Sequence, residues 1–191
     1  MPSVIELNGK NPMKSKFLLA ILVLALSTFG PVTAGNPAQA GDAIESIRQH
    51  YANINQNVAR YRRVKKDLAG YSAEGGELFA YFHGPSVMKM VATFFGETGR
   101  HVEEYYFWDG QLIFVLSTDN RYDKPLSGKV VRKVENRFYF KDDKLIRWLD
   151  ENGKEVASDS PEYAPKQADY LKTSKQFVDG AKSKAATIES P

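Results

Sequence analysis

A run of short, aromatic-rich segments separated by turn residues extends from Glu77 to Val156 and narrows the folds open to this 191-residue chain. The clearest turn is Asp109-Gly110, between two apolar segments, because a two-residue type I′ hairpin needs positive φ at both loop positions. The connections are too short for helical crossovers, so neighbouring strands are expected to run antiparallel. The predicted strands cover residues 77–83, 87–95, 101–108, 111–118, 130–141 and 144–149, with a weaker segment at 64–71.

A two-residue loop fixes the register of its hairpin, and therefore the face on which each side chain lies. With Asp109-Gly110 as the loop, one face carries Tyr105, Phe107, Leu112, Phe114 and Leu116, and the other carries Tyr106, Trp108, Ile113 and Val115. The Asp142-Asp143 turn likewise places Phe138, Phe140, Leu145 and Leu149 on one face, and Arg137, Tyr139, Ile146 and Trp148 on the other. Both hairpins are therefore expected to be apolar on both faces.

A sheet that is apolar on both faces needs a cover on each of them. After Asp42, a residue suited to an N-cap, apolar residues recur at helical spacing at Ile44, Ile47, Tyr51, Ile54, Val58 and Tyr61. A second helix is indicated after Pro161 by the spacing of Tyr163, Gln167, Tyr170, Ser174, Phe177 and Ala181. The alternatives are a sheet that curls on itself and a sheet with one open face.

These elements predict an α+β fold: an N-terminal amphipathic helix, a mostly antiparallel meander of six or seven strands, flat or curled, and a C-terminal helix. We expect residues 41–180 to form a single domain, because that length is ordinary for one hydrophobic core. Residues 181–191 are expected to be a disordered tail.

The N-terminal residues have the three parts of an export signal. Two lysines precede an apolar stretch at residues 17–26, and Ala38-Gln39-Ala40 forms a small-x-small cleavage site. Val32-Thr33-Ala34 is a second candidate cleavage site, and Met13 is an alternative start. The apolar stretch is too short to span a bilayer. We therefore expect residues 1–40 to be removed, which leaves a periplasmic or secreted protein with no transmembrane span.

Composition excludes several kinds of site. The chain has no cysteine, which rules out disulfides, thiolate metal sites and a Cys nucleophile. Its formal net charge of +3 does not indicate a nucleic-acid binder. No glycine-rich phosphate loop or serine-nucleophile motif is present. The sequence therefore points to no cofactor and no metal.

One pair of residues is a candidate for acid–base or weak metal chemistry. His101 and Glu103 share a face of their strand, whereas the adjacent Glu104 points to the opposite face, so the two glutamates cannot act together. Two ligands are fewer than the three that catalytic zinc requires. We therefore expect His101 and Glu103 to be part of a hydrogen-bonded strand edge rather than a catalytic site.

The second face of the two hairpins is the preferred candidate for a binding surface. Its members are Tyr106, Trp108, Arg137, Tyr139 and Trp148, and Arg137 is predicted opposite Trp148, within reach of a cation–π contact. Large exposed apolar patches mark partner or ligand sites. The alternative is that these aromatic residues form core beneath a helix or inside a barrel.

Three segments carry a resemblance to known proteins: Ile47-Arg48-x-x-Tyr51-x-x-Ile54-Asn55, Glu104-Tyr105-Tyr106-Phe107 and Phe138-Tyr139-Phe140. In these segments the chain resembles small exported bacterial β-rich proteins of uncharacterised function. The resemblance implies a fold and a compartment, and it supplies no activity.

Three functions from different classes follow. The first is a non-catalytic module that binds an envelope macromolecule through the aromatic face. The second is a carrier of an apolar ligand in a curled sheet, suggested by Met88, Met90 and Phe94 on one strand face. The third is a hydrolase that uses Glu103 and His101. The oligomeric state and the identity of the ligand do not follow from the sequence.

Overall fold

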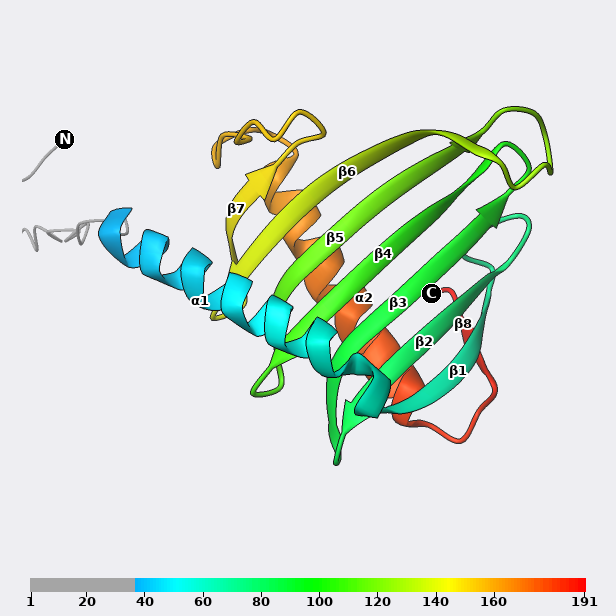
Figure 1. Cartoon of the computed structure of the whole chain (residues 1–191), viewed down its shortest axis with the longest axis horizontal. Helices are drawn as coiled ribbons and strands as arrows, with labels where there is room; N and C mark the ends of the chain where they lie inside the picture. Colours follow the sequence, from blue (N-terminus) through cyan, green and yellow to red (C-terminus); the bar gives the residue numbers. More distant parts are fainter. Residues whose placement is uncertain (1–36) are drawn as a thin grey trace, which may run out of the picture. The chain divides into compact units, whose positions relative to one another are not determined.

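The computed structural model describes residues 37–191, which belong to one compact unit (Figure 1). The predicted export signal lies largely outside the described residues. The elements, in chain order, are α1 Pro37–Asn57, a 3₁₀ turn η1 Val58–Arg60, β1 Arg62–Ala69, β2 Gly76–His83, β3 Ser86–Gly96, β4 Gly99–Trp108, β5 Gln111–Tyr122, β6 Val130–Lys141, β7 Lys144–Leu149, α2 Tyr163–Lys182 and β8 Thr187–Glu189. No helix among the described residues has the length and apolarity needed to cross a membrane.

The strands form one sheet in the order β7-β6-β5-β4-β3-β2-β1-β8. The predicted antiparallel meander is confirmed for β1 to β7, and the weak segment near residue 64 is a full strand. The predicted number of six or seven strands is wrong, because β8 pairs with β1 in parallel and makes the sheet mixed. The tail expected to be disordered therefore holds the end of α2 and a strand. A three-residue strand with one apolar residue, Ile188, has no detectable periodicity.

Buried Lys66 helps to hold this C-terminal segment against β1. Its ammonium group donates hydrogen bonds to the carbonyl oxygens of Ser183, at 2.9 Å, and Ala185. A buried lysine requires such partners, because an unpaired ammonium group in the interior is costly. Ile188 is buried in the core on the α2 side.

Each face of the sheet carries one helix and one hydrophobic core. On the α2 side the largest buried residues include Tyr105, Phe107, Phe138, Phe140, Trp148, Tyr170 and Phe177. On the α1 side the core consists of Ile44, Ile47, Ile54, Met88, Tyr106, Ile113, Phe114 and Tyr139. The predicted C-terminal helix is confirmed. The predicted apolar stripe of the N-terminal helix also faces the sheet, but α1 begins at Pro37, so Asp42 lies inside the helix and is not its N-cap.

The hairpin registers contain bulges that the sequence did not reveal. In β3, β5 and β7 the third residue after the two-residue turn is an extra one: Met88, Ile113 and Ile146 have no partner in the register. All three pack into or against the core under α1. A bulge turns two successive side chains toward one face, so beyond each bulge the predicted faces exchange.

Several face assignments are corrected by these bulges. Phe114 lies on the α1 side and Val115 on the α2 side, the reverse of the prediction. Trp148 is likewise on the α2 side, where it opposes Phe138 rather than Arg137. Met88 and Met90 lie in different cores. They therefore do not share the strand face that was predicted to hold an apolar ligand.

Candidate functional site: two clefts beside α1

A polar network fastens the C-terminal half of α1 to the sheet. Lys89 of β3 contacts Glu104 of β4 at 2.6 Å and donates a hydrogen bond to Asn55 of α1 at 3.0 Å. The hydroxyl of Tyr106 donates to Glu104 at 2.6 Å and contacts the Asn55 side-chain oxygen at 3.2 Å. Burial, together with the charge of Glu104, raises the pKa of Tyr106, so this hydroxyl stays a donor. The network fixes the position of α1, and with it the clefts on either side of the helix.

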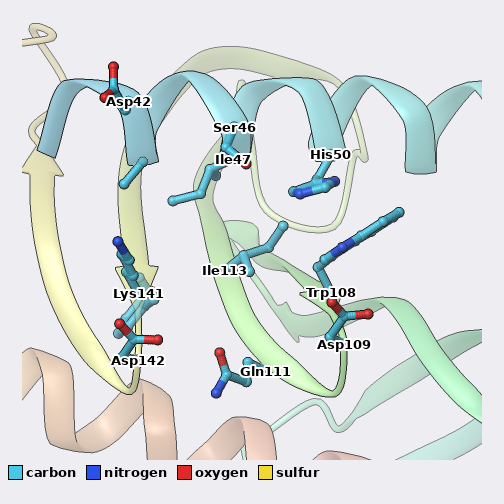
Figure 2. Close-up of a pocket in the computed structure, with 12 residues that line it drawn as sticks. Asp42, Ser46, Ile47, His50, Trp108, Asp109, Gln111, Ile113, Lys141 and Asp142 are labelled. Atoms are coloured by element: carbon cyan, nitrogen blue, oxygen red, sulfur yellow. The ribbon is translucent and has the colours of Figure 1, made fainter. Parts of the chain in front are cut away.

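The first cleft, which we call the acidic cleft, lies between the N-terminal half of α1 and the turns of the β4–β5 and β6–β7 hairpins (Figure 2). Its volume is about 380 Å³. The imidazole of His50 stacks on the indole of Trp108 with ring centroids 3.9 Å apart. The charged residues of the lining are Asp42, Asp109, Asp142 and Lys141. With three carboxylates and one ammonium group, this cleft disfavours anions.

The second cleft, which we call the basic cleft, lies beside α1 over β5 and β6 and has a volume of about 420 Å³. Its apolar lining consists of Ile47, Tyr51, Phe114, Leu116 and Tyr139. Phe114 contacts Tyr51 edge-on at a centroid distance of 5.4 Å and Tyr139 at 4.9 Å. Such aromatic contacts hold the rings in fixed orientations, so the floor is formed before any ligand binds. Ile47 lines both clefts.

The rim of the basic cleft carries the cations Arg48, Lys133 and Arg137 and the carboxylates Glu104 and Glu135. Both carboxylates already have partners: Glu135 contacts Lys133 at 2.5 Å and Arg137 at 2.8 Å, and Glu104 is held in the network under α1. A guanidinium has five N–H donors, and Arg137 uses few of them here. The rim therefore offers unused donors and an excess of positive charge.

The structure divides the five residues predicted as a binding surface. Tyr139 and Arg137 line the basic cleft and Trp108 lines the acidic cleft. Tyr106 is fully buried beneath α1. Trp148 lies on the opposite face of the sheet, where it packs on Phe138 at 5.1 Å. The predicted flat patch is therefore not formed, and the predicted Arg137–Trp148 contact is wrong.

His101 and Glu103 lie on the α2 side, in a cleft that Asp169 and Lys172 of α2 also line. The two imidazole nitrogens are both occupied: Nδ1 contacts Asp119 at 2.7 Å and Nε2 contacts Glu103 at 3.2 Å. Burial lowers the pKa of His101, but the hydrogen bonds and charges of the two carboxylates outweigh it, and the net effect is a raised pKa. The imidazole is thus a structural link between β4 and β5, with no nitrogen left to act on a substrate.

Glu103 also accepts a hydrogen bond from buried Tyr105, and the expectation that Glu103 and Glu104 lie on opposite faces is confirmed. Within residues 37–191, no group of three or more His, Asp or Glu side chains is arranged to hold a metal ion.

Sequence reasoning missed the α1 residues of both clefts. His50 lies off the predicted apolar stripe, yet it stacks on Trp108, and Arg48 was assigned no role. The signal lies in the helical spacing: Arg48 and Tyr51 are three residues apart and therefore share one side of the helix. Lys133, Glu135 and Arg137 alternate along β6 and therefore share one face of the sheet.

Comparisons of the chain with protein-family models, with curated proteins and with solved structures return no match.

Proposed function

We propose that this protein is an exported, non-catalytic binding module, and that the basic cleft binds a small anionic ligand with a flat apolar body. The observation that carries the proposal is the combination of three rim cations with a preformed floor of Tyr51, Phe114 and Tyr139. Ligand sites in proteins are typically apolar clefts with a few well-placed polar groups. A volume of about 420 Å³ falls within the range of such sites.

The positive charge of the rim of the basic cleft favours an anionic ligand. Because Glu104 and Glu135 are already paired, an incoming carboxylate, sulfonate or phosphate meets the donors of Arg48, Lys133 and Arg137. Arginine suits this task because its planar fork can bind an anion through two hydrogen bonds at once. The aromatic floor would contact the apolar body of the same ligand.

The other two functions have less support. A carrier with an enclosed apolar cavity does not match clefts that open to solvent beside α1 and have charged rims. A hydrolase at His101 and Glu103 lacks an available imidazole nitrogen, because both nitrogens already contact carboxylates. A general base must lie within hydrogen-bond reach of the proton that it removes.

The test is a fluorescence titration with anilinonaphthalene sulfonate, a flat aromatic probe with one anionic group. We expect saturable binding that weakens about tenfold in Arg137→Gln, the effect of losing one charge-assisted contact. Arg63→Gln is the matched control, because Arg63 is an exposed arginine of β1 outside the cleft. Equal binding by both variants would contradict the assignment to the basic cleft. Native mass spectrometry of the protein from its source then identifies the natural ligand.

A further inference from the structure

The end of the sheet opposite the β4–β5 and β6–β7 turns has unusual surface chemistry. It consists of the β3–β4 turn and the β5–β6 loop, residues 95–100 and 119–133, which we call the loop end. The two parts are joined by hydrogen bonds from the Leu126 amide to the Glu97 carbonyl at 2.7 Å and from the Tyr122 amide to the Thr98 carbonyl at 2.9 Å. Figure 1 shows the strand ends of β3 to β6 meeting there, away from α1.

Large apolar side chains are exposed at the loop end. Among the described residues, the large hydrophobic side chains that are exposed are Phe95, Leu126, Val130 and Val131, and all four belong to this end. Leu126 is 74 % exposed and Val131 is 58 % exposed. Single exposed apolar residues are common, but a cluster marks an interaction site.

The backbone at Leu126 adds an independent observation. This residue has a φ of 58°, a left-handed conformation that disfavours residues other than glycine, asparagine and aspartate. A leucine at this position is thus disfavoured both by its backbone conformation and by its exposure to water. Such a local cost is found where the side chain serves an interaction.

The charge of the loop end is strongly one-sided. It carries six cations (Arg100, Arg121, Lys124, Lys129, Arg132 and Lys133) against three carboxylates (Glu97, Asp119 and Asp123), a net charge of +3. Residues 37–191 carry +1 in total, so the remainder of the described chain carries −2. Arg121 and Arg132 are direct cross-strand partners, and Arg132 also contacts Glu151, which lies outside the loop end, at 3.8 Å.

We infer that the loop end docks on an anionic lipid surface. Apolar residues surrounded by cations are suited to a bilayer surface, because the side chains enter the boundary between headgroups and acyl chains while Lys and Arg meet the headgroup charges. Leu126 and Val131 would enter the lipid, and Lys124 and Lys129 would remain at the headgroups.

The loop is already ordered in a way that suits this role. Ser127 donates a hydrogen bond to Asp123 at 2.6 Å, and Lys129 contacts the same carboxylate at 3.2 Å. The hydrogen bond from Ser127 is the main cause of a lowered pKa at Asp123. With Asp123 held inside the loop, docking would require little ordering of the backbone.

The test is hydrogen–deuterium exchange of the full chain with phosphatidylcholine vesicles, with and without phosphatidylglycerol. This readout is specific to position, so binding through the N-terminal apolar stretch does not mimic it. We expect protection of residues 95–100 and 121–133 with the anionic vesicles only, and no protection of the turns at 109–110 and 142–143. Added salt should weaken the effect.

Variants separate the contribution of the cations of the loop end from that of its exposed apolar side chains. Vesicle affinity should fall about fivefold for Lys124→Gln and again for Lys129→Gln, and about tenfold for Leu126→Gly, a change that also suits the local backbone. Lys154→Gln, an exposed cation outside the loop end, is the charge-matched control and should bind like the original protein. Equal protection by neutral vesicles, or unaltered binding by the loop variants, would overturn the inference. So would protection of the loop end by an oligonucleotide or by self-association in place of anionic lipid.

Discussion

The imidazole of His50 in α1 stacks on the indole of Trp108 at the end of β4, with ring planes 20° apart and centroids separated by 3.9 Å. This contact joins the middle of α1 to the sheet at the acidic cleft, whereas Lys89 holds the C-terminal end of the helix through Asn55. The two contacts hold α1 against the sheet at two points along its length.

Replacing His50 with alanine should destabilise the protein by about 0.5–1.5 kcal/mol, the contribution of an aromatic pair beyond its buried area. Chemical denaturation measures the difference. Gln49→Ala is the control, since Gln49 is an exposed neighbour in the same helix, and it corrects for the higher helix propensity of alanine. If both variants lose the same stability, the stack contributes nothing beyond what the helix itself supplies.

The ion pair between Lys89 and Glu104 should matter much more than an exposed pair. Lys89→Met leaves Glu104 without its cation in a partly buried site, and we expect a loss of about 2 kcal/mol in the free energy of unfolding. Lys65→Met is the matched control, because the Lys65–Glu77 pair, at 3.1 Å, is more exposed and should cost less than about 1 kcal/mol.

A double variant shows whether the unpaired charge of Glu104 causes the loss of stability in Lys89→Met. Lys89→Met combined with Glu104→Gln removes the unpaired charge, so it should regain part of the stability that Lys89→Met lost. No recovery in the double variant would mean that the packing of the lysine stem, and not its charge, stabilises this region.

Much of the fold follows from local chemistry, but the bulges do not. Asp109 and Gly110 both have positive φ, at 49° and 79°, as the sequence predicts for this hairpin. The extra residue Ile113 is as apolar as its neighbours, so nothing in the pattern distinguishes a bulge from regular alternation. Ile113 packs in the core under α1, and this tertiary contact is not visible in the local pattern.

The clefts could be predicted only in part for the same reason. Trp108, Arg137 and Tyr139 do line clefts, because the alternation of side chains along a strand decides locally which of them lie on the same face of the sheet. Which residues of α1 lie above them depends on the angle at which the helix crosses the sheet, and that angle arises from packing. The exchange of Trp148 to the other face follows from the bulge at Ile146.

Deletion of Ile113 tests the bulge directly. In the observed register Ile113 has no partner, so its removal leaves Leu112 opposite Phe107 and Phe114 opposite Tyr106. We expect a folded protein that is less stable by about 2–4 kcal/mol, because one buried isoleucine under α1 is lost. In a hairpin without a bulge, the same deletion would move Phe114 and all later residues of β5 to the opposite face. Loss of cooperative thermal unfolding would therefore contradict the observed register.

The stability of the protein should depend on the protonation of His101. The pKa of His101 is raised in the folded state by Glu103 and Asp119 despite burial, so the folded protein holds this proton more tightly than the unfolded chain does. The resulting stabilisation is complete below the unfolded value of about 6.5 and is lost as pH rises through the raised folded pKa. The ring of Phe94 in β3 lies near the imidazole, with centroids 5.9 Å apart, and Asp169 and Lys172 line the same cleft.

The test is the difference in melting temperature between the original protein and His101→Gln, measured across this pH range. We expect the variant to be least stable, relative to the original protein, in the acidic part of the range, and the difference to shrink as pH rises. His83→Gln is the control, since His83 lies exposed at the β2–β3 turn. A difference that stays constant with pH would show that the imidazolium does not link β4 to β5.

Two helical glycines should respond in opposite ways to the same substitution. Alanine is favoured over glycine inside a helix by about 1 kcal/mol, and a Cβ atom at Gly41 of α1 would meet nothing within 4 Å. Gly41→Ala should therefore stabilise the protein by roughly that amount. At Gly180 of α2, the same atom would lie 2.4 Å from Cδ1 and 2.6 Å from Cγ1 of Ile188 in β8. Because Ile188 is buried between α2 and β1, we expect Gly180→Ala to cost about 1–3 kcal/mol through overpacking.

Hydrogen exchange should then show faster exchange at residues 187–189 in Gly180→Ala and no change there in Gly41→Ala. If Gly180→Ala stabilised the protein to the same extent as Gly41→Ala, the close approach of α2 and β8 would be wrong. The seating of Ile188 against Gly180 acts together with the Lys66 contacts and the backbone pairing to hold β8 alongside β1, so the placement of this strand would then rest on those contacts alone.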